Sequence, residues 1–479
     1  MAYFWGFTVD DALVSGRIAA HLAQGAGYRF NVDGPVVDAV TPLGWALLLV
    51  PFASRGALSA VNAARWLGAA AWLGASFWLG VRVAQGGQRW VRFAPLLLLP
   101  LCAPLGAWAV AGMETGVVLL LATLALARSR WHILAAGLAA AWRPELGAWA
   151  VVLVAGRTFV ESKSAGRAAA SGLLAAAPSI LVAVVRAAVF SSPAPLAVLA
   201  KPSDLQSGLF YAAAAFIWTG VAWLVLRPLG VARVVLRVVW SAAAPSVAVP
   251  GWARRDESRI SDGGRAVLVA AGAHLVAMVL AGGDWMTLFR LAVPVLPSLL
   301  LVAAEVAEAS PIWATAIRTL LGAGLSMWLA VDLAPAARSV WQNRVALVSE
   351  AAPYLASARA VAALDVGWVG AATSSDIVDL AGITDRAVAA LPGGHTSKQL
   401  PSSFLRGRHA DHLVLALPPG QSAAEPWYTS WFERRVERTV AEQAFEQDLV
   451  YRKVATLRVG DTGRTYLVLR MAAGEQEHD

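Results

Sequence analysis

Residues 168–190 read AAASGLLAAAPSILVAVVRAAVF, a run in which Arg186 is the only charged residue. A helix of about 20 apolar residues is long enough to span the hydrocarbon core of a bilayer. Similar runs, several of them shorter, recur along the chain. We predict a polytopic α-helical membrane protein with about ten spans, at residues 62–83, 93–111, 114–128, 131–142, 145–160, 168–190, 207–227, 265–282, 290–307 and 311–332.

The composition also indicates a membrane protein. Hydrophobic residues make up 58% of the 479 residues and charged residues 15%, with a mean hydropathy of +0.59, whereas a soluble domain carries about a quarter charged residues. The net charge of +8 does not indicate nucleic acid as a partner, because most arginines lie in short loops between apolar runs. The single cysteine, Cys102, lies within an apolar run, which excludes a disulfide framework and a thiolate metal site.

Basic residues predict the orientation. They cluster in four loops, at residues 82–92, 128–130, 157–167 and 227–265. These loops fall on one side if the spans alternate, and loops rich in Arg and Lys remain in the cytoplasm. The N-terminal segment and the loops that contain Glu114, Lys201 and Asp284 are then expected on the outer side.

The chain changes character at about residue 334, where charged residues become frequent and short β-rich runs appear. Strand candidates are residues 360–364, 412–415 and 466–469. We predict a transmembrane module at 1–333, with an outer loop at 1–61, and an α/β domain at 334–479. Span parity places this domain on the outer, extracytoplasmic side.

Two adjacent carboxylates, Asp10 and Asp11, lie in the run FTVDDALV at residues 7–14. Ionisable residues beside a membrane are costly, so they are candidates for a functional site. Asp10 alone would be explained as a helix N-cap, but a cap needs only one carboxylate.

An amphipathic helix is expected over residues 11–24. Its two faces are Val14, Ile18 and Leu22 on one side, and Arg17, His21 and Gln24 on the other. Such a helix lies on the membrane surface. Only nine residues precede Asp10, too few for a span that carries the N-terminus across. We favour a sequence that begins late or is a fragment; otherwise the short N-terminus inserts without its own span.

Further charged residues lie at expected span ends. Glu114, in GMET at 112–115, lies between two spans at the mouth of the bundle. Arg143 and Glu145 flank a proline, where they form either an ion pair between two short helices or part of a substrate site.

The motif GGDWM at residues 282–286 is the strongest of these signals. Two glycines end a helix, Asp284 can cap the next one, and Trp285 suits a membrane interface. Capping leaves Arg290 at the membrane edge without a role. A guanidinium there can bind a lipid phosphate through two parallel hydrogen bonds, and Lys201 can add a second cationic contact.

Five motifs in order resemble those of GT-C-fold glycosyltransferases, in particular the terminal arabinofuranosyltransferases that use polyprenyl-phosphate arabinose. They are the acidic pair with GAGYRFN (25–31), GMET, RPE (143–145), GGDWM with Arg290, and DLAGITD (379–385). The family has tyrosines where this chain has Leu13 and, in DAVT (38–41), Val40. These departures concern acceptor or sugar specificity more than the basic chemistry.

The resemblance implies an inverting transferase in a bacterial-type inner or plasma membrane. It would move a sugar from a polyprenyl-phosphate donor to a cell-envelope glycan or lipid acceptor on the outer face. Asp10 is the expected general base, and Asp11 orients it or the sugar. The expected donor-phosphate and substrate-binding residues are Arg290, Lys201, Asp284, Trp285, Glu114, Arg143 and Glu145. The outer domain would bind the acceptor or cover the cleft. No cofactor is required, a divalent metal ion is compatible, and no metal ligands are assigned.

Two other functions stay open. A transporter or flippase of lipid-linked sugars would use the charged residues to line a path. The clustering of acidic groups on one side argues against it, because a path should mark both sides. A catalytically inactive family member acting as a scaffold is the third interpretation, favoured by the missing first span. The sugar, the acceptor and the oligomeric state are not predicted.

Overall fold

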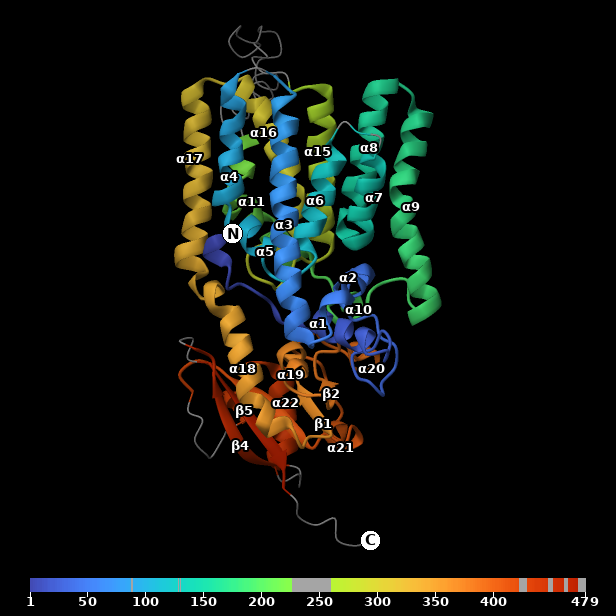
Figure 1. Ribbon diagram of the computed structural model, residues 1–479, viewed down its shortest axis with the longest axis vertical. Coiled ribbons are helices and arrows are strands. Elements are labelled where there is room, and N and C mark those ends of the chain that lie inside the picture. Colours follow the sequence, from blue (N-terminus) through green and yellow to red (C-terminus); the bar gives the residue numbers. More distant parts are fainter. Residues whose placement is uncertain are drawn as a thin grey trace, which may run out of the picture.

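The computed structural model describes residues 1–87, 89–127, 129, 131–225, 260–421, 429–446, 451–460 and 464–472. A bundle of helices forms one part of the molecule, and a small α/β domain is attached to one end of it (Figure 1). Arg128, Arg130 and the basic residues of 227–259, which contribute to two of the predicted cytoplasmic loops, lie outside the described residues.

Five helices are long and apolar enough to cross a membrane. They are α3 (Ala57–Ala84), α9 (Ala165–Phe190), α15 (Asp262–Leu280), η5 with α16 (Arg290–Glu308), and α17 with its π-helical end (Ile312–Leu333). A sixth apolar segment is bent by 55° between η3–α4 (Trp90–Leu101) and α5 (Ala103–Ala109). Pro100 and Pro104 flank this bend, and prolines interrupt the helical hydrogen bonds there.

The predicted number of ten spans is not confirmed for the described residues. Four of the predicted spans are helices of 11 to 16 residues: α6 (Thr115–Leu126), α7 (His132–Trp142), α8 (Gly147–Ser162) and α11 (Leu205–Trp218). Helices of this length are shorter than the hydrocarbon core, which needs about 20 residues. The RPE motif separates α7 from α8 by one 3-10 turn, η4 (Pro144–Leu146), as expected for a broken pair.

The run at 168–190 forms most of α9, which lies at the edge of the bundle (Figure 1). Its N-cap Ser164 accepts a hydrogen bond from the backbone N–H of Arg167. Only 11% of its most apolar window is buried. An apolar helix with so little burial is suited to lipid rather than to water.

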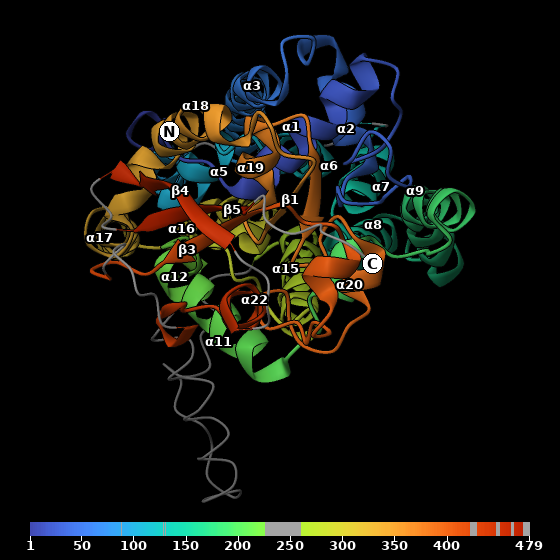
Figure 2. The same ribbon diagram turned by 90° about the horizontal axis from the view of Figure 1, so that it is seen from below.

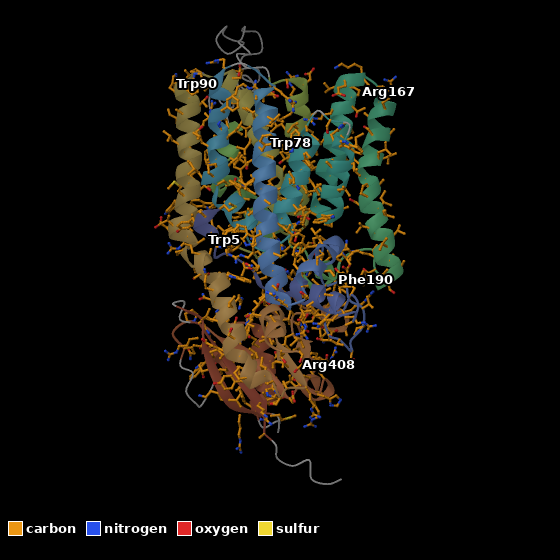
Figure 3. All side chains as sticks on the ribbon, in the orientation of Figure 1. Trp5, Trp78, Trp90, Arg167, Phe190 and Arg408 are labelled. Carbon is orange, nitrogen blue, oxygen red and sulfur yellow. The ribbon has the colours of Figure 1, made fainter. Side chains whose placement is uncertain are left out.

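Tryptophans lie at several levels of the bundle; Trp90 and Trp66 are 68% and 61% exposed, whereas Trp5 is half-buried. Trp90 lies at the end far from the α/β domain, with Arg167, whereas Trp5 lies much closer to the domain (Figure 3). The rings of Trp5 and Trp66 contact each other at 4.5 Å between centroids. Trp78, which lies between Trp90 and Trp5 in Figure 3, is 44% exposed as well, so exposed tryptophans are spread along the bundle.

Short helices connect the bundle to the α/β domain. On the N-terminal side these are η1 (Ala2–Phe4), α1 (Asp10–Ala23), α2 (Leu43–Leu49) and η2 (Val50–Phe52); later in the chain they are α10 (Leu196–Ala200), η6 (Leu329–Leu333), η7 (Pro335–Ser339) and α18 (Val340–Leu355). The short helix α12 (Ala222–Val225) instead packs on α16 and α17 within the bundle. The helix α18 leads from the end of α17 into the domain (Figure 1).

A five-stranded mixed sheet forms the centre of the α/β domain, in the order β2-β1-β3-β5-β4. The strands are β1 (Ala360–Ala363), β2 (Asp376–Asp379), β3 (His412–Leu417), β4 (Tyr451–Arg458) and β5 (Thr465–Met471). β1 pairs in parallel with β2 and β3, whereas β5 pairs antiparallel with β3 and β4. The three predicted strands are confirmed as β1, β3 and β5, and the sequence analysis missed β2 and β4.

Both faces of this sheet are covered. Alternate strand residues such as Leu413 and Leu415 form a hydrophobic cluster with Val436 of α22 (Arg435–Glu446). The residues between them, such as Val414, belong to the core that continues into the helical bundle. Burial on both faces explains why the central strands read as nearly continuous apolar runs. The remaining domain helices are α19 (Val366–Ala372), α20 (Arg386–Ala389), α21 (Phe404–Gly407) and η8 (Thr429–Trp431).

The interpretation of residues 11–24 as an interfacial helix was wrong. α1 is buried on its polar as well as its apolar side, because the α/β domain packs against it (Figure 2). Arg17 is 3% exposed and donates hydrogen bonds to the carbonyl oxygens of Phe30, Thr373 and Ser375, each at 2.8 Å. The polar side chains of α1 therefore bind another part of the protein rather than water.

The orientation of the bundle can be tested with introduced cysteines. Arg359→Cys places a thiol on an 85% exposed side chain of the α/β domain, whereas Arg167→Cys places one at the opposite end. In intact cells an impermeant maleimide should label the first and spare the second, which should react only after permeabilisation. Cys102 is buried and should give little background. Labelling of Arg167→Cys alone would reverse the orientation.

Candidate functional site

A cavity of about 750 Å³ lies where the helical bundle meets the α/β domain. We call it the interdomain cavity. Its walls come from the N-terminal segment, the loop after α15, the end of α17 with η7 and α18, and the α/β domain. It brings together four residues that the sequence singled out, Asp10, Asp11, Asp284 and Trp285.

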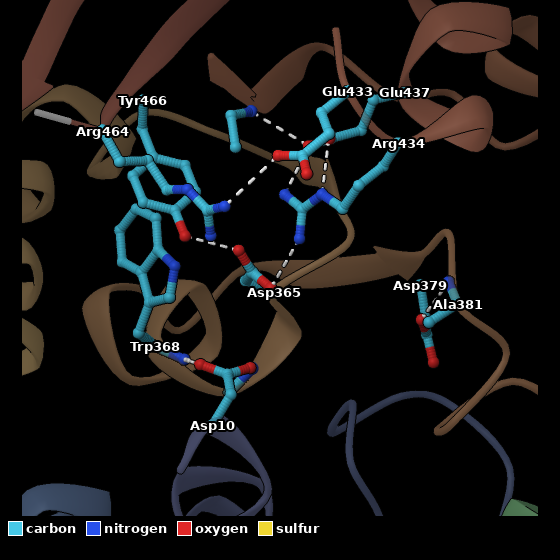
Figure 4. Close-up of polar contacts among 12 residues, drawn as sticks. Asp10, Asp365, Trp368, Asp379, Ala381, Glu433, Arg434, Glu437, Arg464 and Tyr466 are labelled. Atoms are coloured by element: carbon cyan, nitrogen blue, oxygen red, sulfur yellow. Dashed lines mark hydrogen bonds and ion pairs between the residues drawn. The ribbon is translucent and has the colours of Figure 1, made fainter. Parts of the chain in front are cut away.

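The carboxylate of Asp10 is bound to the N-terminus of α19. It accepts hydrogen bonds from the backbone N–H groups of Gly367 (2.6 Å) and Trp368 (3.0 Å; Figure 4), and it lies 3.8 Å from Arg344 Nε. The close approach requires glycine, since a Cβ at position 367 would lie 2.1 Å from the Asp10 carbonyl oxygen. Burial raises the pKa of Asp10 to about 6, against the opposing effect of Arg344.

Asp10 and Arg17 bind opposite ends of the same short helix. Asp10 accepts from the first N–H groups of α19, and Arg17 donates to the carbonyl of Gly370 and to that of Thr373, just past its end. A carboxylate at the N-terminus and a guanidinium at the C-terminus both complement the helix dipole and satisfy unpaired backbone groups. α1 therefore holds the α/β domain against the bundle.

Asp11 differs from its neighbour. Its side chain lines the interdomain cavity, and within the described part of the chain its carboxylate has no hydrogen bond or ion pair. The negative charge of Asp11 acts to raise the pKa of His395, on the domain side of the cavity, against the larger lowering by burial. Of the two adjacent carboxylates, Asp11 is the one whose oxygens remain available to a ligand.

A group of charged residues in the α/β domain forms another wall. Asp365 accepts from Arg434 Nη1 (2.9 Å) and from the Tyr466 hydroxyl (2.5 Å), and Arg434 also donates to Glu437 (2.6 Å) (Figure 4). Although burial opposes it, Arg434 and Arg344 hold the pKa of Asp365 well below its usual range. These cations are therefore neutralised by carboxylates of the protein itself.

The sequence analysis missed this group. Asp365 lies two residues after the last residue of β1, and side chains after a parallel strand gather at ligand sites of open α/β sheets. That signal was available for Asp365. Arg434 lies immediately before α22, and Tyr466 lies in β5. No local sequence pattern indicated that these two residues would contact Asp365.

Asp284 and Arg290 form an ion pair. Both Nε and Nη2 of Arg290 lie 2.9 Å from Asp284 Oδ2, and the guanidinium lies 5.6 Å from the centre of the Trp108 ring. Asp284 lines the interdomain cavity, whereas Arg290 does not. The guanidinium expected to bind a lipid phosphate is thus used to position Asp284.

Glu114, Arg143 and Glu145 also form an internal cluster. Arg143 Nη1 lies 2.8 Å from Glu114 and Nη2 2.5 Å from Glu145. Glu114 has no exposed surface, so its expected position at the mouth of the bundle was wrong. The three residues hold the ends of α6 and α7 and the turn η4 together, as in the ion-pair interpretation, and none of them lines the interdomain cavity.

Lys201, Trp285 and His395 lie together beside the cavity. Lys201 Nζ is 5.4 Å from the centre of the Trp285 ring, and the His395 ring is 5.3 Å from it. Among the described residues Lys201 has no carboxylate partner. Burial, followed by the charge of Lys201, lowers the pKa of His395 to about 4, so its imidazole is neutral near pH 7.

The loop between Asp284 and Arg290 has an unusual backbone. Leu288 and Phe289 both adopt the left-handed region, with φ of 62° and 50°. Such residues cost about 1–3 kcal/mol each and persist where surrounding contacts hold them. Trp108 Nε1 donates to the Leu288 carbonyl at 2.8 Å, and the Tyr211 hydroxyl accepts from the Leu291 N–H at 3.0 Å. The cavity wall is therefore preformed.

The fifth motif, DLAGITD, is a turn after β2. Asp379 accepts from the N–H groups of Ala381 (2.7 Å), Gly382 (3.0 Å) and Thr384 (2.5 Å). This buried carboxylate shapes the loop that brings Ala381 and Ile383 to the cavity. Its contacts are structural.

The structure offers little for a bound metal. No three His, Cys, Asp or Glu side chains of the described ranges are grouped so that they could hold an ion. The adjacent side chains of Asp411 and His412 are hydrogen-bonded to each other at 3.1 Å and belong to no such group.

No family model, curated protein or solved structure matches this chain. The resemblance to GT-C-fold glycosyltransferases therefore stays a prediction that rests on the five motifs.

The neutral state of His395 can be tested through the pH dependence of stability. Its pKa is about 4 when folded and 6.5 in the reference state, so between these values the unfolded chain binds a proton that the folded chain does not. The free energy of unfolding should fall as the pH is lowered through this window. Between about pH 7 and about pH 5, the Tm of His395→Gln should therefore fall less than the Tm of the unmutated protein. His409→Gln, outside the cavity, is the control. An equal loss in all three proteins would show that His395 is not buried as described.

Proposed function

We propose that the chain is an inverting glycosyltransferase of the GT-C type. It would transfer a sugar from a polyprenyl phosphate to a glycan or lipid acceptor of the cell envelope, on the outer face of a bacterial-type membrane that it crosses several times. One observation carries the proposal. Among the residues that the structure describes, the carboxylate of Asp11 and the ammonium group of Lys201 have no charged partner, and both lie near one preformed cavity at the end of an apolar bundle.

The two charges suit the two ends of the reaction. Asp11 takes the proton of the acceptor hydroxyl, whose oxygen forms a bond to the anomeric carbon of the sugar. The bond from that carbon to the phosphate oxygen breaks, and the polyprenyl phosphate leaves with the electron pair. A single displacement of this kind inverts the anomeric centre.

Asp11 is preferred to Asp10 as the base, in contrast to the expectation from the sequence. Both oxygens of Asp10 already accept backbone hydrogen bonds, and a general base must be free to reach the proton that it abstracts. Asp10 then acts as the residue that holds α1 and α19 together, so that Asp11 faces the cavity.

The leaving phosphate is assigned to Lys201. Arg290, Arg344 and Arg434 each have a carboxylate partner. An anion that displaced one of these carboxylates would leave a nearly buried charge without a partner, which is costly. Trp285, which lies close to both Lys201 and His395, is 54% exposed and lines the cavity, so its ring is available for stacking on a sugar.

A transporter remains the second candidate, because another cavity of about 700 Å³ lies at the far end of the bundle, lined by charged residues such as Asp262 and Glu305. The two cavities share no lining residue. Helix α6 ends beside the far cavity, where its C-cap Ala127 is part of the lining, and is roughly 18 Å long. Its buried residues from Val118 to Leu126 are apolar except Thr123. A polar path for a sugar would have to cross this apolar layer, so the transferase is favoured.

The acidic pair provides matched variants for catalysis. Asp11→Asn should lower product formation by a factor of ~10² or more, because the base is lost, while Tm stays unchanged. Asp10→Asn should lower Tm as well as activity, since a hydrogen bond to a charged group contributes about 1.5–3 kcal/mol. The assay is sugar transfer by the purified protein, with Tm measured in parallel. An active Asp11→Asn protein would exclude Asp11 as the base.

Lys201→Gln should weaken donor binding by about ten- to a hundredfold, corresponding to one lost contact with a charged group. Arg290→Lys should have a smaller effect on donor affinity, because the guanidinium is used by Asp284. Acceptor affinity should change little in either variant. The measurement is a titration of a short-chain polyprenyl-phosphate sugar in detergent. A larger effect of Arg290→Lys would assign the phosphate to Arg290, and no transfer by the unmutated protein would contradict the transferase.

A further inference from the structure

The interdomain cavity has walls of two kinds. The domain side and α1 contribute the charged groups described above. The segment from Leu329 to Val340, which joins α17 to α18, contributes only apolar side chains to the lining. A cavity with both kinds of wall suits an amphiphile rather than a free sugar.

The apolar wall begins at a π-helical turn. α17 changes at Leu329–Leu333 into the π-helix η6, and Pro335 follows. π-helical turns are rare and occur frequently at functional sites. Leu329 is buried and faces the cavity, whereas Leu333 lines the cavity although 53% of it is exposed. Pro335 and Ala336 are likewise exposed and part of the lining. These three residues form an apolar rim.

The rim is continuous with the exposed apolar face of α17. Leu320, Met327 and Val331 recur at helical spacing and are 72%, 51% and 51% exposed. Helix α17 lies at the edge of the bundle and leads directly to α18 and the α/β domain (Figure 1). An apolar chain that leaves the cavity over the rim can therefore continue along this face, past the exposed side chain of Asp332.

We propose that the rim of Leu333, Pro335 and Ala336 is the place where the isoprenoid chain of a lipid-linked substrate leaves the cavity and passes along α17 into the membrane. The identity of the chain rests on the proposed function; the position of the rim does not. Charge supports this occupant over a partner protein, because Asp11 lines the cavity behind the rim and Lys201 lies beside it, and these two charges suit a sugar hydroxyl and a phosphate.

The first experiment compares chain lengths. Leu333→Trp narrows the rim, and Leu181→Trp places the same side chain on α9, at a 64% exposed position away from both the cavity and α17. With a long-chain polyprenyl-phosphate sugar, Leu333→Trp should lower kcat/KM about tenfold, as expected for steric overpacking. With a short-chain donor both variants should stay within about twofold of the unmutated protein. Ala336→Leu is a second rim variant with the same expectation. Equal effects on both donors, or no effect on either, would overturn the proposal.

The second experiment does not require transfer. The purified full chain is irradiated with a long polyprenyl phosphate that carries a diazirine on its chain, and the labelled peptides are identified by mass spectrometry. Labelling of residues 327–340 supports the rim, and labelling confined to α9 or other bundle helices overturns it. Labelled rim residues without sugar transfer would contradict the transferase and leave the rim intact. Sugar transfer without labelling of the rim would support the transferase and overturn the rim as the exit of the chain.

Discussion

The contact between α1 and α19 is the interaction on which the site depends. Asp10 accepts from the first N–H groups of α19, and Arg17, two turns later on α1, donates to the carbonyls at its other end. Residues 357 positions apart in the chain are joined in this way. Because both contacts follow the polarity of the helix, α19 can dock in only one direction, and the cavity between the bundle and the domain acquires a defined shape.

Charge pairing then determines which residues remain for chemistry. Arg290 is bound by Asp284, Arg143 by Glu114 and Glu145, and Arg434 by Asp365 and Glu437. Each pair removes two charges from the set that could bind a substrate, and breaking a buried pair is costly. Asp11 and Lys201 are left without such partners among the described residues. They come from α1 and from the loop after α10, so the site exists only when the N-terminal segment, the bundle and the domain are assembled.

Local patterns were sufficient for much of the fold. The apolar run 168–190 forms most of α9. The β-rich runs form β1, β3 and β5, because burial of a strand on both faces leaves a continuous apolar run in the sequence. Predictions failed where a distant segment changed the environment. Arg17 reads as the polar side of a surface helix until the carbonyls of residues 370–375 cover it. Glu114 reads as exposed until Arg143 arrives from the end of α7. The meeting of Asp365, Arg434 and Tyr466 is a tertiary fact that no spacing encodes.

The helical position of the acidic pair explains why two carboxylates are needed side by side. Successive residues on an α-helix point about 100° apart, so neighbours do not share partners. Asp10 points to α19, whose first N–H groups donate hydrogen bonds to both of its carboxylate oxygens. Asp11 points to the cavity. A single aspartate could supply either the docking contact or an available oxygen, but not both. The pair thus links assembly to the position of an available carboxylate. The contact that joins α1 to α19 is made one residue away from the side chain that lines the cavity, so the docking of the α/β domain and the placement of Asp11 depend on the same turn of α1.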